Sequence, residues 1–146
     1  MAGKPTFVDT SVIVAASVAE HPSHGVAREA IEQLVRDRAP LCISPQICRE
    51  ILVVLTRQPV AGRTFTTEES LAVLGGWRRA TNLLAENGAS VNAVETLVER
   101  HGVRGKQVHD CNIVAVMPVN KIGRLVTRNP ADFKRFKEIA VEPVSG

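Results

Sequence analysis

The stretch Thr6-Phe7-Val8-Asp9-Thr10-Ser11-Val12-Ile13-Val14-Ala15-Ala16 sets one acidic residue between two apolar runs. The first run, residues 6–8, is prone to β structure, and the second, residues 12–16, can begin a helix. Asp9 is therefore expected at the carboxyl end of a strand. An ionised carboxylate in such apolar surroundings is costly unless it shares a cation with other ligands.

The same alternation of short strands and helices continues along the chain. Further strands are predicted at residues 41–43, 89–91, 124–126 and 140–141. Helices are predicted at residues 23–36, 45–56, 67–87, 93–100, 105–117 and 130–136, with capping boxes at Thr66 with Glu69 and at Asn92 with Glu95. Alternation of this kind predicts one α/β domain over residues 1–146, with a central parallel sheet and helices on both faces.

Length and composition limit the classes of protein to consider. A chain of 146 residues that is 45% hydrophobic can build one real core. It holds no apolar run of transmembrane length, and residues 1–5 lack the pattern of a secretory signal, so we expect a cytoplasmic protein without a membrane partner. Three cysteines without a C-x-x-C pair favour neither a disulfide framework nor a zinc site.

Four acids occur where an ionised side chain is expensive. Asp9 ends an apolar run, Glu50 and Asp110 interrupt the apolar stripes of predicted helices, and Asp132 follows the apolar run at residues 124–126. Ligands gather at the carboxyl ends of parallel strands, where these acids are expected to meet. A cluster of carboxylates favours Mg²⁺, with Mn²⁺ as a possible substitute, and a metal-activated water could then hydrolyse a phosphodiester.

Several of these acids also have a purely structural explanation. Asp9 can cap the helix that follows it, and Asp110 can interact favourably with the dipole at the N-terminus of its helix. Asp132 stands three residues after Asn129, so the two can form a capping box around Pro130. Glu50 has no such explanation, which favours a functional role for it.

Charge is consistent with a polyanionic partner without proving one. The net charge is only +3, but nine basic residues crowd the last third of the chain: Arg100, Arg104, Lys106, Lys121, Arg124, Arg128, Lys134, Arg135 and Lys137. A basic rim around an acidic centre suits a nucleic-acid substrate. The alternative explanation of this basic cluster is that its residues only form the solvated faces of helices.

Four segments in order resemble the PIN-domain ribonucleases, and among them the VapC toxins of toxin–antitoxin pairs. They are Phe7-Val8-Asp9-Thr10-Ser11-Val12, Ser44-Pro45 with Arg49-Glu50-Ile51, Val108-His109-Asp110-Cys111-Asn112-Ile113-Val114-Ala115, and Leu125-Val126-Thr127-Arg128-Asn129-Pro130-Ala131-Asp132-Phe133. The resemblance implies a sheet of about five parallel strands, with Mg²⁺-dependent cleavage of RNA. It also implies a VapB-like antitoxin that inhibits the enzyme, and a homodimer.

The family's metal acids map onto Asp9 and Asp110, with Glu50 completing the cluster. Its fourth catalytic position falls on Asn129 or Asp132, and Thr10 or Thr127 can assist by hydrogen bonding. Because Asn129 carries no charge, the number of metal ions stays open. Proline at position 118 departs from the family pattern and leaves Asn120 as the candidate end of that helix.

Two other functions are compatible with parts of the sequence. The chain can keep the fold and bind RNA or a protein without cleavage, and the neutral Asn129 leaves that possibility open. A receiver-type phosphoacceptor explains Asp9 poorly, because the further acids and the late lysine of such a site are missing. The apolar helices at residues 23–36 and 44–56 could form a groove for a helix of a partner.

Overall fold

A computed structural model describes residues 2–145 of the chain. In that range the elements are β1 (Thr6–Val8), α1 (Thr10–Ser17), α2 (His24–Arg36), β2 (Leu41–Ile43), α3 (Pro45–Arg57), α4 (Thr67–Ala80), β3 (Asn82–Leu83), α5 (Gly88–His101), α6 (Gln107–Val119), β4 (Arg124–Thr127), the 3-10 helix η1 (Pro130–Asp132) and β5 (Ala140–Pro143). The predicted α/β class and parallel sheet are confirmed.

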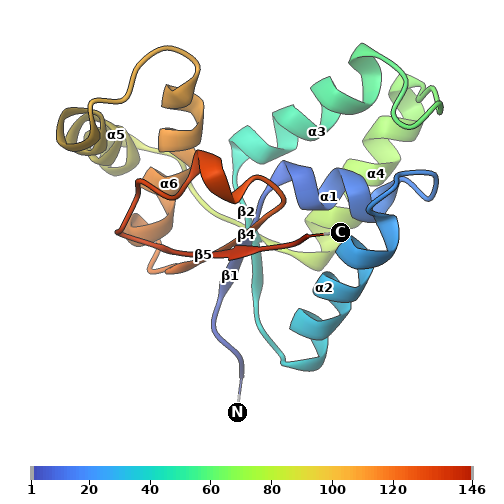
Figure 1. The fold of residues 1–146 in the computed structure, drawn as a ribbon, viewed down its shortest axis with the longest axis horizontal. Coiled ribbons are helices and arrows are strands. Elements are labelled where there is room, and N and C mark those ends of the chain that lie inside the picture. The colour runs from blue at the N-terminus through green and yellow to red at the C-terminus, as the bar shows by residue number, and fades with distance from the viewer. Residues whose placement is uncertain (1, 146) are drawn as a thin grey trace.

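The sheet has five parallel strands in the order β3-β2-β1-β4-β5. Helices α1 to α4 lie on one side of it, and α5 with α6 lie on the other (Figure 1). This distribution follows from chain direction: with right-handed crossovers, the steps from β1 to β3 and the return from β3 to β4 put helices on opposite faces. The central strand β1 and its neighbour β2 are fully buried, as their apolar composition predicts.

The strand order reverses between β1 and β4. From β1 the chain proceeds toward β2 and β3, whereas from β4 it proceeds the other way, to β5. In open parallel sheets such a reversal leaves a crevice beyond the carboxyl ends of the two strands. Asp9 follows β1 there, and its backbone N–H donates to the Val126 carbonyl of β4 at 3.1 Å.

The third strand was predicted in the wrong place. Helix α4 ends at Ala80 instead of residue 87, and the strand is the exposed pair Asn82–Leu83 at the sheet edge. The predicted strand at residues 89–91 and the predicted cap at Asn92 both fall inside α5, which Asn87 caps together with Ser90. A strand of two exposed residues has no apolar pattern that would predict it, whereas the alternation in Ala89-Ser90-Val91 resembles that of a strand.

The segment after β4 is also less helical than predicted. Only η1 forms, and Phe133 and Phe136 then turn into the core. Helix α6 runs two residues beyond the predicted end at Met117, with Pro118 inside its last turn, and Asn120 is its C-cap as expected. The predicted capping box at Thr66 with Glu69 is present at the start of α4.

Helix α1 packs against both α2 and α3, the two helices considered for a partner groove. A small apolar hollow of about 320 Å³ lies between α2 and α4, lined in part by Ile31, Val35 and Trp77. Trp77 packs against the core and donates from its indole nitrogen to Ser17 Oγ at 2.7 Å. No helix within residues 2–145 is long and apolar enough to cross a membrane.

Candidate metal centre

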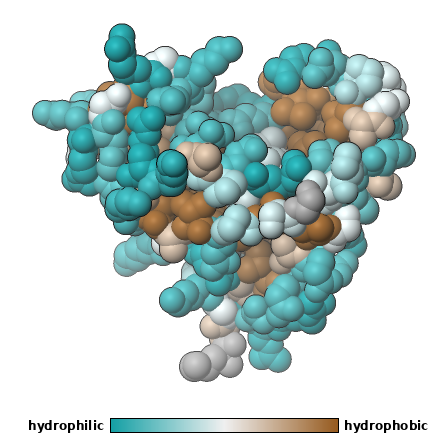
Figure 2. Space-filling model, in the orientation of Figure 1, coloured by the Kyte–Doolittle hydropathy of each residue, from teal (hydrophilic) through white to brown (hydrophobic). Residues whose placement is uncertain are grey.

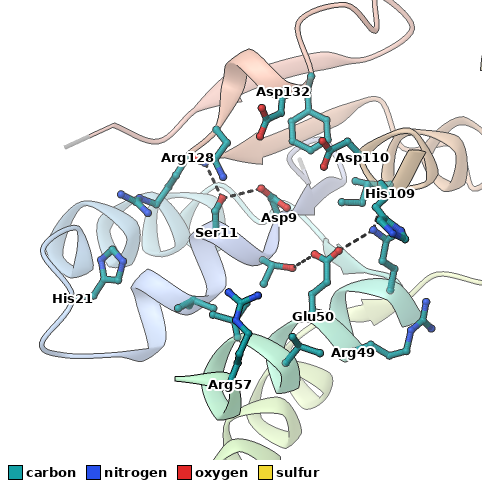
Figure 3. Close-up of a pocket in the computed structure, with 18 residues that line it drawn as sticks. Asp9, Ser11, His21, Arg49, Glu50, Arg57, His109, Asp110, Arg128 and Asp132 are labelled. Carbon is teal, nitrogen blue, oxygen red and sulfur yellow. Dashed lines mark hydrogen bonds between the residues drawn. The ribbon is translucent and has the colours of Figure 1, made fainter. Parts of the chain in front are cut away.

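A cavity of about 690 Å³ opens at the carboxyl edge of the sheet, where β1 and β4 end. Figure 2 shows the surface hollowed between the side formed by α5 and α6 and the side formed by α3 and α4. The predicted site residues all line this cavity: Asp9, Glu50, Asp110, Asn129 and Asp132. Figure 3 shows the four acids directed toward a common centre from different elements.

Asp9 is the most deeply buried of the acids, with 6% of its surface exposed. It occupies the N-cap position of α1, yet its side chain makes no cap hydrogen bond. Instead Oδ2 accepts from Thr127 Oγ1 at 2.7 Å and from Ser11 Oγ at 2.8 Å. Burial raises the pKa of Asp9, these hydrogen bonds lower it, and the charge of Glu50 raises it further.

The two hydroxyls that serve Asp9 are themselves oriented by backbone groups. Ser11 Oγ accepts from the Arg128 N–H at 3.0 Å, and Thr127 Oγ1 accepts from the Asn129 N–H at 3.0 Å. Since each oxygen is occupied as an acceptor, its single proton is available to Asp9. The turn after β4 thereby fixes the carboxylate that follows β1, and both side-chain bonds fall on one of its two oxygens.

Glu50 enters the cavity from the second turn of α3. Its Oε1 accepts from Thr10 Oγ1 at 2.7 Å, and its Oε2 accepts from Gln46 Nε2 at 2.8 Å. The first bond joins α3 to the start of α1, directly beside Asp9. The hydrogen-bonding role considered for Thr10 and Thr127 is thus what both residues perform.

Asp110 lies in the first turn of α6, and its pKa is raised to about 6. Burial is the largest cause, followed by the negative charges of Asp132, Asp9 and Glu50, while His109 partly offsets them. The helix that carries Asp110 follows α5 in the chain. The mutual repulsion shows that the four acids share one electrostatic environment.

The capping explanation for Asp132 is wrong. The side chain of Asn129 makes no cap hydrogen bond in η1, and the Asn129 backbone N–H donates to Thr127 Oγ1 rather than to the Asp132 carboxylate. The Asp132 backbone N–H donates to the Asn129 carbonyl at 3.1 Å, which is an ordinary turn hydrogen bond without the side chains. Asp132 faces the cavity and raises the pKa of Asp110 instead. Its carboxylate is therefore available to a ligand.

The acids form no ion pair within the described part of the chain. No ion pair among residues 2–145 involves Asp9, Glu50, Asp110 or Asp132. Asp9 is buried, Glu50 and Asp110 are half-buried and Asp132 is exposed, so the first three call most for a compensating charge. An all-oxygen donor set fits Mg²⁺ or Mn²⁺. Within the described residues, no three His, Cys, Asp or Glu side chains already meet in a closed coordination geometry. The residues fit a cation that keeps part of its water shell, and their role as ligands stays a prediction.

The rest of the cavity wall is basic or apolar. The basic lining residues are His21, Arg49, Arg57, His109 and Arg128. Arg128 is held at the rim by a 2.8 Å hydrogen bond from Nη2 to Ser23 Oγ. Val53 and Val54 of α3 line the same wall. Figure 2 shows apolar surface exposed over α3.

Sequence reasoning assigned no role to several residues that support the acids. Gln46 carries a clear signal, because it stands four residues before Glu50 and so lies on the same helix face. Glu86 contacts Gln46 and Asn112, but it was predicted inside a long helix, where it would not meet them. The error in α4 therefore hid part of the site.

The sequence matches the PIN domain family over residues 6–139. The chain belongs to the PIN domain family. The resemblance inferred from the four motifs is confirmed, and the fold described above is that of a PIN domain. No curated protein sequence matches this PIN domain significantly.

Solved structures of similar fold come from bacterial toxin–antitoxin systems. VapBC2 from Rickettsia felis, bound to a DNA fragment from its promoter, matches with a TM-score of 0.70 and 18% identity, covering 94% of this chain and 97% of that one. DNA-bound VapBC from Salmonella typhimurium gives a TM-score of 0.67 and 19% identity, covering 97% and 98% of the two chains.

A third similar structure is VapC20 from Mycobacterium tuberculosis, described as a toxin that cleaves the sarcin–ricin loop. It gives a TM-score of 0.61 and 21% identity, covering 82% of this chain and 86% of that one. At these identities the likeness establishes the shared fold over nearly the whole length of the PIN domain.

Proposed function

We propose that this PIN domain is a Mg²⁺-dependent endoribonuclease and the toxin of a type II toxin–antitoxin module. The observation that carries the proposal is the set of four carboxylates that line one cavity at the strand-order reversal of a PIN fold, none of them in an ion pair with another residue of the range 2–145. Asp9, Glu50 and Asp110 are the proposed metal ligands, and Asp132 and Asn129 complete the catalytic set.

A cation held by these residues would lower the pKa of a bound water and neutralise negative charge on the phosphate and the leaving oxygen. The chain's own residues hold the arrangement: Ser11 and Thr127 keep Asp9 in place, and Thr10 does the same for Glu50. Asp110, whose pKa is raised to about 6 in the metal-free protein, is relieved of the repulsion from the neighbouring acids when a cation neutralises their charges.

RNA is the proposed substrate because the basic residues of the cavity wall border the acidic centre. Arg49, Arg57 and Arg128 can contact phosphates on either side of the bond to be cut. Such contacts position the backbone without reading its sequence. An open cavity with an exposed apolar wall also suits an unpaired nucleotide better than a rigid duplex.

The proposed biological role is inferred from the solved structures of similar fold. The VapBC structures contain a toxin with its antitoxin, and by analogy we propose a VapB-like antitoxin as partner and a homodimer as the assembled form. The site of action proposed is the cytoplasm, where cellular RNA is accessible.

The decisive experiment compares purified protein with Asp9→Asn, using Asp37→Asn as the matched control. Asp37 is an exposed acid at the end of α2, remote from the cavity. We expect RNA cleavage that requires Mg²⁺ or Mn²⁺, survives in Asp37→Asn and drops at least about 100-fold in Asp9→Asn. Equal cleavage by Asp9→Asn protein would contradict the proposed site.

A second candidate function is binding of RNA or a protein without cleavage. The specific observation in its favour is the neutral Asn129, which lines the cavity at one of the two possible positions of a fourth acid. Under this alternative, Asp9→Asn protein would bind RNA as well as the wild type does, and neither would cut it. Growth inhibition that persists in Asp110→Asn cells would point the same way.

A further inference from the structure

Gln46 links two of the acids from opposite faces of the sheet. It is buried, with 5% of its surface exposed, and lies at the second position of α3. Its Nε2 donates to Glu50 Oε2 at 2.8 Å and to the His109 carbonyl oxygen at 2.9 Å. The His109 carbonyl belongs to the peptide bond that joins His109 to Asp110. The Gln46 amide therefore contacts the Glu50 carboxylate itself and the backbone that carries Asp110.

The direction of this amide is fixed by its partners. Both acceptors, a carboxylate and a carbonyl, require the nitrogen on their side, and Nε2 has two N–H groups for them. The opposite atom, Oε1, accepts from Asn112 Nδ2 at 2.6 Å. All three bonds would be lost or reversed if the amide were flipped, which leaves one orientation for Gln46.

A carboxylate from a third element secures this arrangement. Glu86 lies between β3 and α5, and its Oε2 accepts from the Gln46 backbone N–H at 2.8 Å while its Oε1 accepts from Asn112 Nδ2 at 3.0 Å. Ser44, the N-cap of α3, provides no side-chain cap, so Glu86 supplies an acceptor and a negative charge at that helix end.

We infer that Gln46 is a positioning residue that sets the separation of Glu50 and Asp110, with Glu86 and Asn112 holding its amide. Helices α3 and α6 lie on opposite sides of the sheet (Figure 1), so their acids share no backbone element that could fix this separation. The Gln46 amide bridges that gap directly. The inference rests on the proposed function, since the consequence of positioning is tighter binding of the cation.

The test measures Mn²⁺ binding by calorimetry, independently of activity, together with the Mn²⁺ dependence of RNA cleavage. Gln46→Met keeps the length and volume of the side chain but removes its three hydrogen bonds. We expect its dissociation constant for Mn²⁺ to rise about 10-fold or more, the usual effect of losing a group that orients a metal ligand. The cleavage rate at saturating Mn²⁺ should fall far less.

Gln33→Met is the matched control, because Gln33 is an exposed glutamine on α2 with hydrogen bonds only on that side of the molecule. Asn112→Ala frees the amide without altering α3, and a loss of about threefold is expected, which keeps the test valid if Gln46→Met is unstable.

The outcomes separate this inference from the proposed function. If Asp9→Asn abolishes Mn²⁺ binding while Gln46→Met and Asn112→Ala bind within twofold of the wild type, the metal site stands and the positioning role is wrong. If the wild type shows no Mn²⁺ binding that depends on Asp9, the proposed function fails, and this inference falls with it.

Discussion

Asp110 illustrates how one residue can serve function at the expense of stability. Its pKa rises from 3.8 to about 6 through burial and through the charges of three neighbouring acids. The folded protein therefore holds this proton more tightly than the unfolded chain does. In the absence of a cation, stability due to Asp110 is complete below about pH 4 and declines as the pH rises from 4 to 6.

Replacing Asp110 by Asn should consequently stabilise the metal-free protein above pH 6. The rise in the pKa of Asp110, discounted because the side chain is partly exposed, corresponds to about 1 kcal/mol in the free energy of unfolding. The Tm of the variant should accordingly be higher by about 3 °C at pH 7.5. Thermal unfolding in EDTA measures the difference, which should vanish at pH 4.

Saturating Mn²⁺ should reverse this order, because the wild type gains binding energy that the variant lacks. A lower Tm for Asp110→Asn in EDTA at pH 7.5 would show that the carboxylate is not under electrostatic strain in the metal-free protein.

At the scale of single elements, α4 offers the clearest local stabilisation. Thr66 Oγ1 accepts from the Glu69 N–H at 3.0 Å, and the Glu69 carboxylate accepts from the Thr66 N–H at 3.0 Å. Thr66→Ala should lower the free energy of unfolding by about 1 kcal/mol, the usual cost of losing such a cap. Urea denaturation measures it, with Thr67→Ala as the control, because Thr67 starts the helix without capping it. An equal loss in both variants would contradict the role of the cap.

The elements also show what a sequence can and cannot reveal. Strands β1 and β2 were predicted with their observed ends, because buried central strands are continuous apolar runs. The pair Asn82–Leu83 forms a strand only because β2 offers hydrogen-bonding partners, which no local pattern records. In the same way Asp9, Glu50 and Asp110 could be predicted from their apolar surroundings. Glu86 could not, because its partners lie 40 and 26 residues away.

At the scale of the whole molecule, Glu138 ties the end of α5 to the chain entering β5. It accepts from Arg100 and from His101, whose ring meets Phe136 edge to face at 5.1 Å. Burial alone would raise the pKa of Glu138, but the hydrogen bonds from His101 and Arg100 lower it to about 2. The stability it contributes is present above about pH 4.5 and is lost as the pH falls toward 2.

Glu138→Gln should therefore destabilise the protein by about 2 kcal/mol at pH 7, after allowance for partial exposure, and by less than half of that at pH 3. Urea denaturation at the two pH values measures the change. Glu142→Gln is the control, since its contact with Arg124 is longer, at 3.5 Å, and more exposed. A difference that does not depend on pH would show that the ion pairs are not its source.

The hydrogen bond from Thr127 to Asp9 spans 118 residues of sequence, and this separation has a consequence during synthesis. A ribosome produces the amino end first, so Asp9 emerges long before β4 and the turn that orients its carboxylate. Until β4 has left the exit tunnel and paired with β1, the cavity has one wall missing. Under the proposed function, the metal site of a nascent chain stays incomplete until β4 pairs with β1.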